Sequence, residues 1–273
     1  MCYVRSRGTM IYTMITAGCG MAALVAIVTA TEFIDPVERH SVRSRLRGLL
    51  FSIMNAGLGV GFFGLVSSCV RALGIAPVLK IGVGGLVGDW AAVLIGLLFF
   101  DFLKYWNHRF QHRFLWRIHS LHHSQTQLHA ANGYGHFCER GLAFFLFALP
   151  LALVQFQFPA TPYVVVTACS LLELYIHSPT GAHFGRLSLI VVDNRFHRVH
   201  HSIERRHFDR NFGITFSIWD RIFGTACDLA ADEWPETGVA GIEPPRSISN
   251  YLLFPLRRGA ARSRGSEFQA GVI

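Results

Sequence analysis

Two long stretches without a charged side chain constrain this sequence more than any other feature. Residues 9–31 and 48–70 each contain 23 consecutive residues with no Asp, Glu, Lys or Arg. A helix of that length crosses about 30 Å of hydrocarbon. Only 15% of the 273 residues are charged, whereas soluble domains carry about 25%. The sequence therefore predicts an integral membrane protein and excludes a disordered chain.

The first stretch also has features of a secretory signal. Arg5 and Arg7 precede it, and Val28-Thr29-Ala30 near its end would pass as a cleavage site. The stretch is longer than the core of a signal peptide, however, and long enough to span a bilayer. A first transmembrane helix is therefore the preferred interpretation.

Two further apolar segments complete the predicted architecture. Residues 89 to about 103 form a third span that ends before Lys104 and Trp106, residue types found at a membrane–water boundary. Residues 141–176 contain Pro159 and Pro162 and predict a helical hairpin. Its arms of about 15 to 18 residues either cross the bilayer or enter it and return. We expect an all-α, multi-pass transmembrane protein with a helical cap in the cytosol.

The positive residues of the short loops predict the orientation of the chain. Two Lys and Arg residues precede the first span, four lie between the first and second, and two lie between the second and third. The segment after the third span begins with four more, Lys104, Arg109, Arg113 and Arg117. Loops rich in Lys and Arg favour the cytosol, so residues 104–140 are expected there, and the hairpin returns the chain to the same side. This explains most of the net charge of +8 without nucleic acid.

The cysteines and glycines indicate no redox cofactor of the chain's own. The six cysteines are scattered, without a Cys-x-x-Cys pair, and are expected to be free thiols. Gly59-Val-Gly61-Phe-Phe-Gly64 fits a dinucleotide-binding pattern but lies inside a span, with no preceding strand. Electrons for any redox reaction must therefore come from a separate protein.

Histidine is over-represented, and its spacing predicts metal binding. Thirteen of the 14 histidines lie between His108 and His207. Offsets of three and four residues place side chains on one face of a helix, and imidazole is the commonest metal ligand. A lone histidine is more often a polar interface residue, but a repeated pattern favours ligation. The groups are His108-x3-His112, His119-x2-His122-His123 and His197-x2-His200-His201. Eight ligands exceed the four of one tetrahedral site, so two ions are expected.

The spacing of these groups requires a break in the helix. His108 and His119 are eleven residues apart, about 16 Å along a straight helix, so we expect a break near residues 113–116. Asp101 lies seven residues before His108 and is either a hydrogen-bond acceptor for that imidazole or an acid that ends the third span. Glu173, the only charge in the hairpin, is a contact of a metal ligand, a proton carrier or an acid at the headgroup level.

Five ordered motifs resemble those of the fatty acid hydroxylase and sterol desaturase superfamily. They are Asp101-Phe-Leu-Lys-Tyr-Trp-Asn-His108-Arg-Phe-Gln-His112, Leu115-Trp116-Arg-Ile-His119-Ser-Leu-His122-His123-Ser, Phe196-His197-Arg-Val-His200-His201-Ser, Asp209-Arg-Asn211-Phe-Gly213 and Trp219-Asp220-Arg-Ile-Phe223-Gly224-Thr225. The resemblance implies a membrane-embedded, non-haem di-iron enzyme that uses O2 to hydroxylate or desaturate a fatty acyl lipid, sterol or isoprenoid. It also implies a further histidine about twenty residues before the last triplet, where His177 stands.

The resemblance implies that nine histidines bind two iron ions (Fe2+/Fe3+) and take part in catalysis through these metals. They are His108, His112, His119, His122, His123, His177, His197, His200 and His201. Candidates for contacts that orient the ligand rings are Asp101, Glu173, His136, His183, Asp209 and Asn211. His129 and His207 rank lower as ligands, and His40 is a loop residue. The chain departs from the family at His177-Ser178-Pro179, at His183 and at Tyr134-Gly135-His136-Phe137. These departures surround the expected substrate side and leave the nine histidines intact.

These expectations define three regions: residues 1–88 as an N-terminal transmembrane region, 89–228 as the catalytic domain including hairpin 141–176, and 229–273 as a loose basic tail. The substrate would enter from the bilayer, and a cytochrome b5, ferredoxin or rubredoxin type of protein would donate electrons. The membrane is the bacterial inner membrane or the endoplasmic reticulum. Alternatives are an acyl-lipid desaturase, a carotenoid hydroxylase, an inactive relative, or a metal-binding or metal-transporting membrane protein without catalysis, which would need ligands along a path through the spans.

Overall fold

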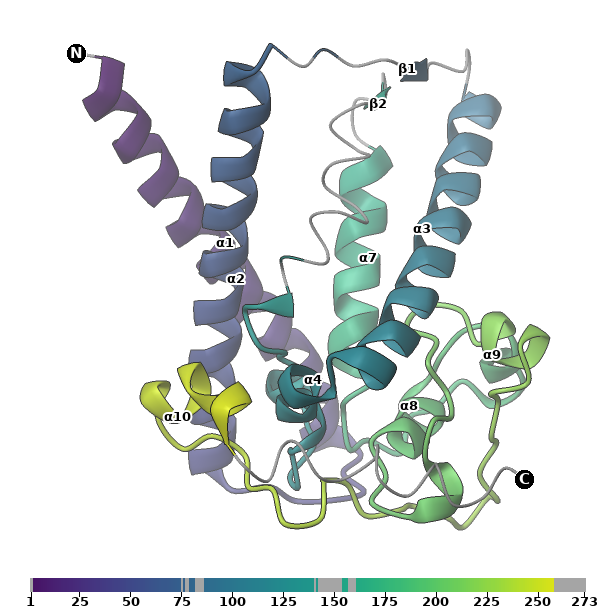
Figure 1. The fold of residues 1–273 in the computed structure, drawn as a ribbon. Helices are drawn as coiled ribbons and strands as arrows, with labels where there is room; N and C mark the ends of the chain where they lie inside the picture. The colour runs from purple at the N-terminus through teal and green to yellow at the C-terminus, as the bar shows by residue number, and fades with distance from the viewer. Residues whose placement is uncertain are drawn as a thin grey trace.

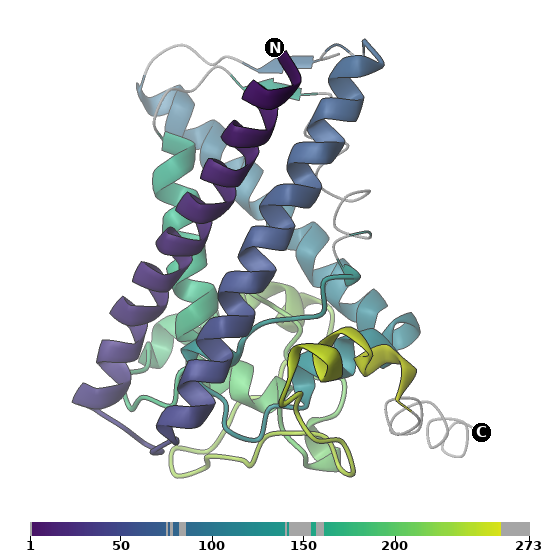
Figure 2. The same cartoon turned by 90° about the vertical axis from the view of Figure 1, so that its left-hand side faces the viewer.

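Long helices stand on a compact cap of short helices and loops (Figures 1 and 2). The computed structural model describes residues 2–74, 76, 79–81, 86–139, 141, 154–156 and 161–257. The long helices are α1 (Cys2–Ile34), α2 (Val42–Ala72), α3 (Leu86–Phe114) and α7 (Thr161–Tyr175). At the end opposite the cap, β1 (Leu79–Ile81) pairs in parallel with β2 (Val154–Phe156). This short strand pair was not expected; the fold is otherwise helical or irregular within the described residues.

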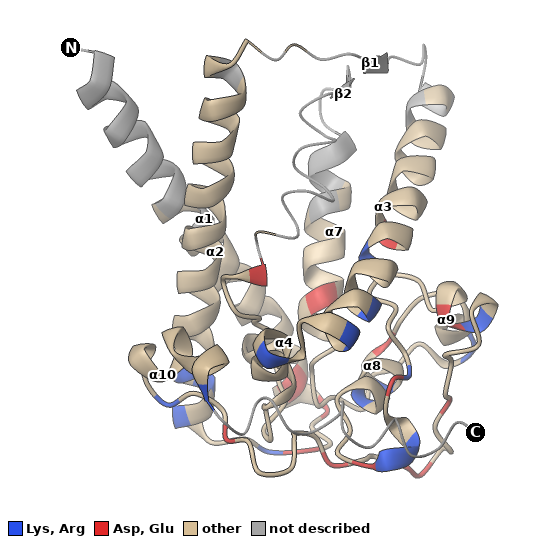
Figure 3. Ribbon diagram, in the orientation of Figure 1, with Lys and Arg blue, Asp and Glu red and all other residues tan. Residues whose placement is uncertain are grey.

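Length and composition favour a membrane location for part of this helical bundle. Within the described residues, Val42–Val70 of α2 is long and apolar enough to cross a membrane, and Gly18–Ile34 of α1 is a shorter apolar stretch. Charged side chains gather in the cap and at the cap ends of the helices, whereas the described upper parts of α2 and α3 have none (Figure 3). The apolar part of the bundle thus suits lipid, and the cap suits water.

The third predicted span and the hairpin differ from expectation in their extent. Helix α3 does not end near residue 103 but continues to Phe114. Lys104, expected to mark a water boundary, instead forms an ion pair with Glu173 of α7. The second arm of the hairpin corresponds to α7, and most of the first arm lies outside the described residues.

The cap is assembled from short elements separated by loops. Its α-helices and 3-10 helices (η) are α4 (Trp116–His123), η1 (Ala130–Asn132), η3 (Gly185–Leu189), α8 (Asn194–His200), η4 (Arg205–His207), α9 (Ile218–Ile222), α10 (Ile248–Leu252) and η5 (Phe254–Leu256). Such short helices are not stable alone, so packing against neighbouring elements must hold them in place.

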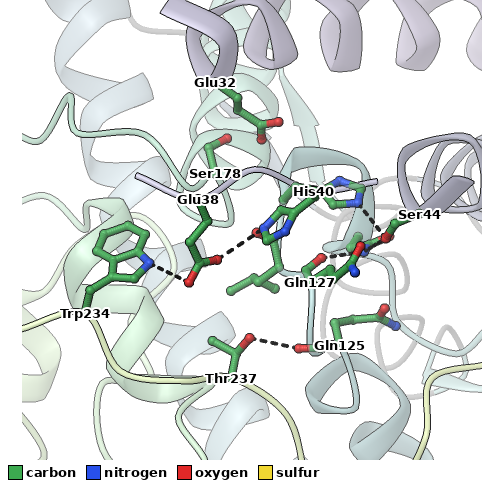
Figure 4. Close-up of polar contacts among 12 residues, drawn as sticks. Glu32, Glu38, His40, Ser44, Gln125, Gln127, Ser178, Trp234 and Thr237 are labelled. Carbon is green, nitrogen blue, oxygen red and sulfur yellow. Dashed lines mark hydrogen bonds and ion pairs between the residues drawn. The ribbon is translucent and has the colours of Figure 1, made fainter. Parts of the chain in front are cut away.

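The loop between α1 and α2 packs against the cap. Figure 4 shows Glu38 between two partners: Trp234 donates its indole Nε1–H to Oε1 at 3.0 Å, and His40 Nε2 lies 3.2 Å from Oε2. Arg198 of α8 also donates to Glu38 Oε1, at 2.5 Å. In the same view, Thr237 donates to the carbonyl of Gln125 at 3.0 Å. This loop, α8 and the C-terminal segment are therefore held together by polar contacts.

The described part of the C-terminal region is not the loose tail that its basic composition predicted. Tyr251 of α10 and Phe254 of η5 are fully buried. The Tyr251 ring stacks on Phe51 of α2 with centroids 5.3 Å apart, and its hydroxyl donates to the carbonyl of Gly135 at 3.0 Å. The aromatic residues of this segment thus complete a core between α2 and α4; residues 258–273 lie outside the described part.

Candidate metal centre

A break between α3 and α4 brings the first two histidine groups together. Helix α3 ends at Phe114, Leu115 has φ −118° and ψ 21°, and α4 begins at Trp116. As a result, His108 Nε2 lies 3.1 Å from His119 Nε2, although eleven residues separate them. His112 Nε2 and His123 Nε2 are also 3.1 Å apart. The predicted break near residues 113–116 is therefore present.

The third histidine group lies on α8, whose start is fixed by two side chains. Asp193 caps the helix by accepting a hydrogen bond from Phe196 N at 2.9 Å, the usual role of aspartate at this position. Asn194 donates to the carbonyls of Ser178 and Thr180 at 3.0 and 2.6 Å. Because these carbonyls follow His177, the same contacts place α8 beside that histidine.

The structure gathers all nine expected ligands into two buried groups. The first group contains His108, His112, His119, His123 and His200, and the second contains His122, His177, His197 and His201. Within each group the ligand nitrogens lie within 4.8 Å of one another. Both short helices serve both groups: α4 and α8 each contribute residues to the first and to the second.

The nitrogen positions fit a pair of bound cations. His197 Nε2 lies 3.1 Å from His177 Nε2 and also 3.1 Å from His201 Nε2. One ring nitrogen carries either one proton or one lone pair, so it cannot satisfy two such neighbours by hydrogen bonding alone. Two nitrogens at about 2.1 Å from one ion and at right angles lie about 3 Å apart. The observed spacing is therefore that of neighbouring ligands.

Contacts on the outer side of the rings fix their tautomers. His108 Nδ1 contacts the carbonyl of Phe212 at 2.8 Å, and His200 Nδ1 that of Arg210 at 2.9 Å. His177 Nδ1 contacts the carbonyl of Glu173 at 2.7 Å. A carbonyl accepts only, so each Nδ1 carries the proton and each Nε2 keeps a lone pair. His200 Nε2 is buried without a hydrogen-bond partner among the described residues, so its lone pair is available to a cation.

The cap environment favours neutral imidazoles, the form that binds metals. Burial lowers the pKa of His177 to about 4, even though the carbonyl of Glu173 favours the protonated ring. Burial and then the charges of neighbouring histidines hold the pKa of five other rings well below the ordinary value of 6.5. They are His122, His123, His197, His200 and His201.

The expected supporting residues divide into those near the histidines and those elsewhere. Asp209 Oδ1 lies 3.3 Å from His112 Nδ1. Asp101 was predicted either to accept a hydrogen bond from His108 or to end the third span. Its carboxylate accepts hydrogen bonds from the backbone of Thr215 and Phe216 and from the Trp219 indole, so its observed partners are on the segment before and at the start of α9.

Asn211 supports the site through the backbone. It has a φ of 56°, and its side-chain amide donates to the carbonyls of Phe196 and Cys227, both at 2.8 Å. Its side chain thus ties α8 to the loop that carries the Arg210 and Phe212 carbonyls.

The remaining histidines lie outside the two groups. His183 was expected to contact a ligand histidine. It is instead exposed and accepts a hydrogen bond from Gly185 N. His136 is buried and stacks on Tyr251 with centroids 5.1 Å apart. His129 contacts Ser44 Oγ at 3.2 Å, and His207 contacts Ser202 Oγ at 2.9 Å.

Glu139 is a candidate that the sequence reasoning missed. Its Oε1 lies 3.4 Å from His119 Nδ1, and its Oε2 accepts a hydrogen bond from Gln111 at 3.0 Å. A carboxylate behind a ligand histidine holds the ring and raises its basicity. One signal was available, because Glu139 is the only acidic residue between Asp101 and Glu173.

Comparisons with known proteins agree with the motif resemblance. Residues 93–225 match the family model for fatty acid hydroxylase. An ornithine lipid hydroxylase of Rhizobium tropici is 33% identical over 153 residues, 55% of this chain and 46% of that protein. Human alkylglycerol monooxygenase is 32% identical over 139 residues, 50% of this chain and 30% of that protein. Mouse lathosterol oxidase is 28% identical over 157 residues, 52% and 48% respectively. The chain thus spans less than half of these relatives, and no solved structure matches it significantly.

Proposed function

Residues 93–225 place this chain in the fatty acid hydroxylase family, and on this premise we propose that it is a membrane-bound, non-haem di-iron oxygenase acting on a lipid. The observation that carries the proposal is the pair of buried imidazole groups with five and four members. Five nitrogen donors exceed the four of a closed zinc site, and imidazole suits iron. Two iron ions held by the nine histidines would supply the activation of O2.

The chain's own residues bind the metals and keep water away. The carbonyls of Phe212, Arg210 and Glu173 orient three of the rings. Burial of all nine histidines excludes bulk water from the reacting centre, which protects a reactive oxidant from side reactions. Electrons come from a separate donor protein. In this proposal residues 1–88 and the hairpin are the membrane regions of a multi-pass protein, 89–228 is the catalytic domain, and the cap faces the cytosol.

Transport of a metal is the less suitable alternative. A transporter needs ligands spaced along a path through the membrane. Here the histidines of α3, α4 and α8 converge on one place at the cap end of the bundle, with ligand nitrogens 3.1 Å apart. Such convergence suits permanent ligation. An acyl-lipid desaturase and a carotenoid hydroxylase share the chemistry and stay open as alternative reactions.

Metal analysis of the purified, iron-reconstituted protein tests the proposal. We expect about two irons per chain, a clear loss in His200→Ala, and no loss in His183→Ala, whose histidine is exposed. Lipids of cells that express the protein with a competent electron donor should gain one oxygen atom or lose two hydrogens when O2 is present. Iron well below two per chain in the wild type, or full retention in His200→Ala, would refute the di-iron centre. Unchanged lipids would refute the enzyme.

A further inference from the structure

A cavity of about 390 Å³ connects the metal centre with the helical bundle. Residues of α1, α2, α3 and α7 line it. His108 and His119 of the first group and His122, His177 and His197 of the second also face it. A molecule bound in this cavity therefore lies next to histidines of both groups.

An ion pair stands on the cavity wall next to the histidines. Lys104 and Glu173 contact each other there. Lys104 precedes His108 by four residues, and Glu173 precedes His177 by four, so each charge lies about one helical turn from a ligand, on the side away from the cap. The two side chains are 36% and 44% exposed, so a ligand in the cavity has access to both charges.

A second polar group lies on the same wall. Asn107 also lines the cavity. Its Oδ1 atom is buried and has no hydrogen-bond partner among the described residues. A buried acceptor without a partner is destabilising, because it has lost its hydrogen bond to water and gained none in return. A donor on a bound molecule would remove this cost.

These polar groups do not suit the middle of a hydrocarbon chain. Methylene groups packed against the ion pair would remove water from both charges and return no hydrogen bond. A hydroxyl, amide, amine or carboxylate both fills the space and bonds to Lys104, Glu173 or Asn107. The wall beside the metals is therefore built for the polar part of a lipid.

We propose that Lys104 and Glu173 bind the polar group of the substrate, so that the lipid is oxidised close to that group and not in the middle of an acyl chain. This inference rests on the proposed function. One helical turn rises 5.4 Å. A lipid chain covers this distance with about four carbon–carbon bonds of about 1.5 Å each. The oxidised carbon thus lies within about four bonds of the hydrogen-bonding group.

Product analysis tests the position of oxidation. The protein is incubated with the total polar lipid extract of its expression host, an electron-donor system and O2, and fragment masses locate the change. We expect the new oxygen or double bond in the headgroup or within about four bonds of it. A change in the middle of an acyl chain, with full iron content, would overturn the inference and leave the proposed function intact. No iron and no product would refute the proposed function itself.

Variants of the ion pair test the binding role. Lys104→Met/Glu173→Leu should lower turnover at least tenfold while iron content stays unchanged, because the backbone carbonyl that holds His177 remains. The exchanged pair Lys104→Glu/Glu173→Lys should recover part of the loss. Arg206→Met/Glu233→Leu removes an exposed ion pair of the cap and serves as the matched control. Wild-type turnover in the apolar double variant would overturn the inference.

Lipids retained during purification give a readout that needs no turnover. The wild type and the Arg206→Met/Glu233→Leu control should retain the same polar lipids in native mass spectrometry. The apolar Lys104→Met/Glu173→Leu variant should retain at least several-fold less of them. Equal retention by all three proteins would overturn the inference, whatever the metal content.

Discussion

Replacing Asp101 by asparagine tests whether one carboxylate ties the cap to α3. The side chain is 2% exposed. Its Oδ1 accepts from Thr215 N, and its Oδ2 accepts from Phe216 N and the Trp219 indole, all at 3.0 Å. Asparagine has the same shape but only one acceptor oxygen, so either orientation of its amide turns an NH2 group towards at least one of these donors.

The loss follows from the number of hydrogen bonds. One buried donor without an acceptor costs about 1–3 kcal/mol, and the two remaining bonds lose the help of a full charge, about 1 kcal/mol more. We therefore expect Asp101→Asn to lower the free energy of unfolding by about 2–4 kcal/mol. Asp228→Asn is the matched control, because that carboxylate is 57% exposed in its pair with Arg221 and should change stability by less than about 1 kcal/mol.

Denaturant unfolding in detergent micelles, followed by tryptophan fluorescence, measures the difference. Iron content should fall together with stability, because the 209–217 loop carries the Arg210 and Phe212 carbonyls that orient His200 and His108. An Asp101→Asn protein that unfolds like Asp228→Asn and keeps its iron would refute the reasoning.

Three further predictions concern the C-terminus, the metal support and the loop between α1 and α2. Phe254→Ala should destabilise the protein by about 3–5 kcal/mol in the same unfolding assay, whereas Leu256→Ala, at a position 72% exposed, should have little effect. Equal effects of the two substitutions would instead support a loose C-terminal tail. Glu139→Gln should weaken iron binding by about 10- to 100-fold in a chelator competition, and Glu243→Gln, at an exposed acid, should not; unchanged affinity would exclude support of His119 by this carboxylate. Burial opposes ionisation of Glu38, but His40, Arg198 and Trp234 outweigh it and hold its pKa below 4.5. The ionised Glu38 therefore stabilises the fold fully above pH 4.5, and this stabilisation is lost as the pH falls through the lowered pKa. Glu38→Gln should be less stable than the wild type at pH 7, and the difference should shrink at acid pH. A difference that stays constant with pH would contradict this.

Local patterns were sufficient to predict the features that depend on neighbouring residues. The uncharged runs predicted α1 and α2, because crossing hydrocarbon requires a minimum length of apolar helix. The break at Leu115 followed from the rise of a helix, since His108 and His119 share a site only if the helix stops between them. The grouping of the nine histidines was expected from spacing and from the family resemblance together.

Contacts between distant segments were not predictable in the same way. Asp101 shares a helix face with His108, but its carboxylate turns to backbone donors at Thr215 and Phe216, far along the chain. Residues 246–257 looked like a basic tail by composition, yet Tyr251 is buried against Phe51 of α2. Both outcomes depend on which surfaces meet in three dimensions, which the spacing of charges and apolar residues along one segment does not encode.

The sharing of α4 and α8 between the two histidine groups has a consequence for how the centre fills. Helix α4 supplies His119 and His123 to one group and His122 to the other, and α8 supplies His200 to one and His197 to the other, with His201 following directly at its C-terminal end. If two ions bind as proposed, neither short helix can move its ligands towards one ion without moving ligands of the other. Binding of the first ion should then prepare the second position, so that the ions load cooperatively and chains with a single ion are scarce.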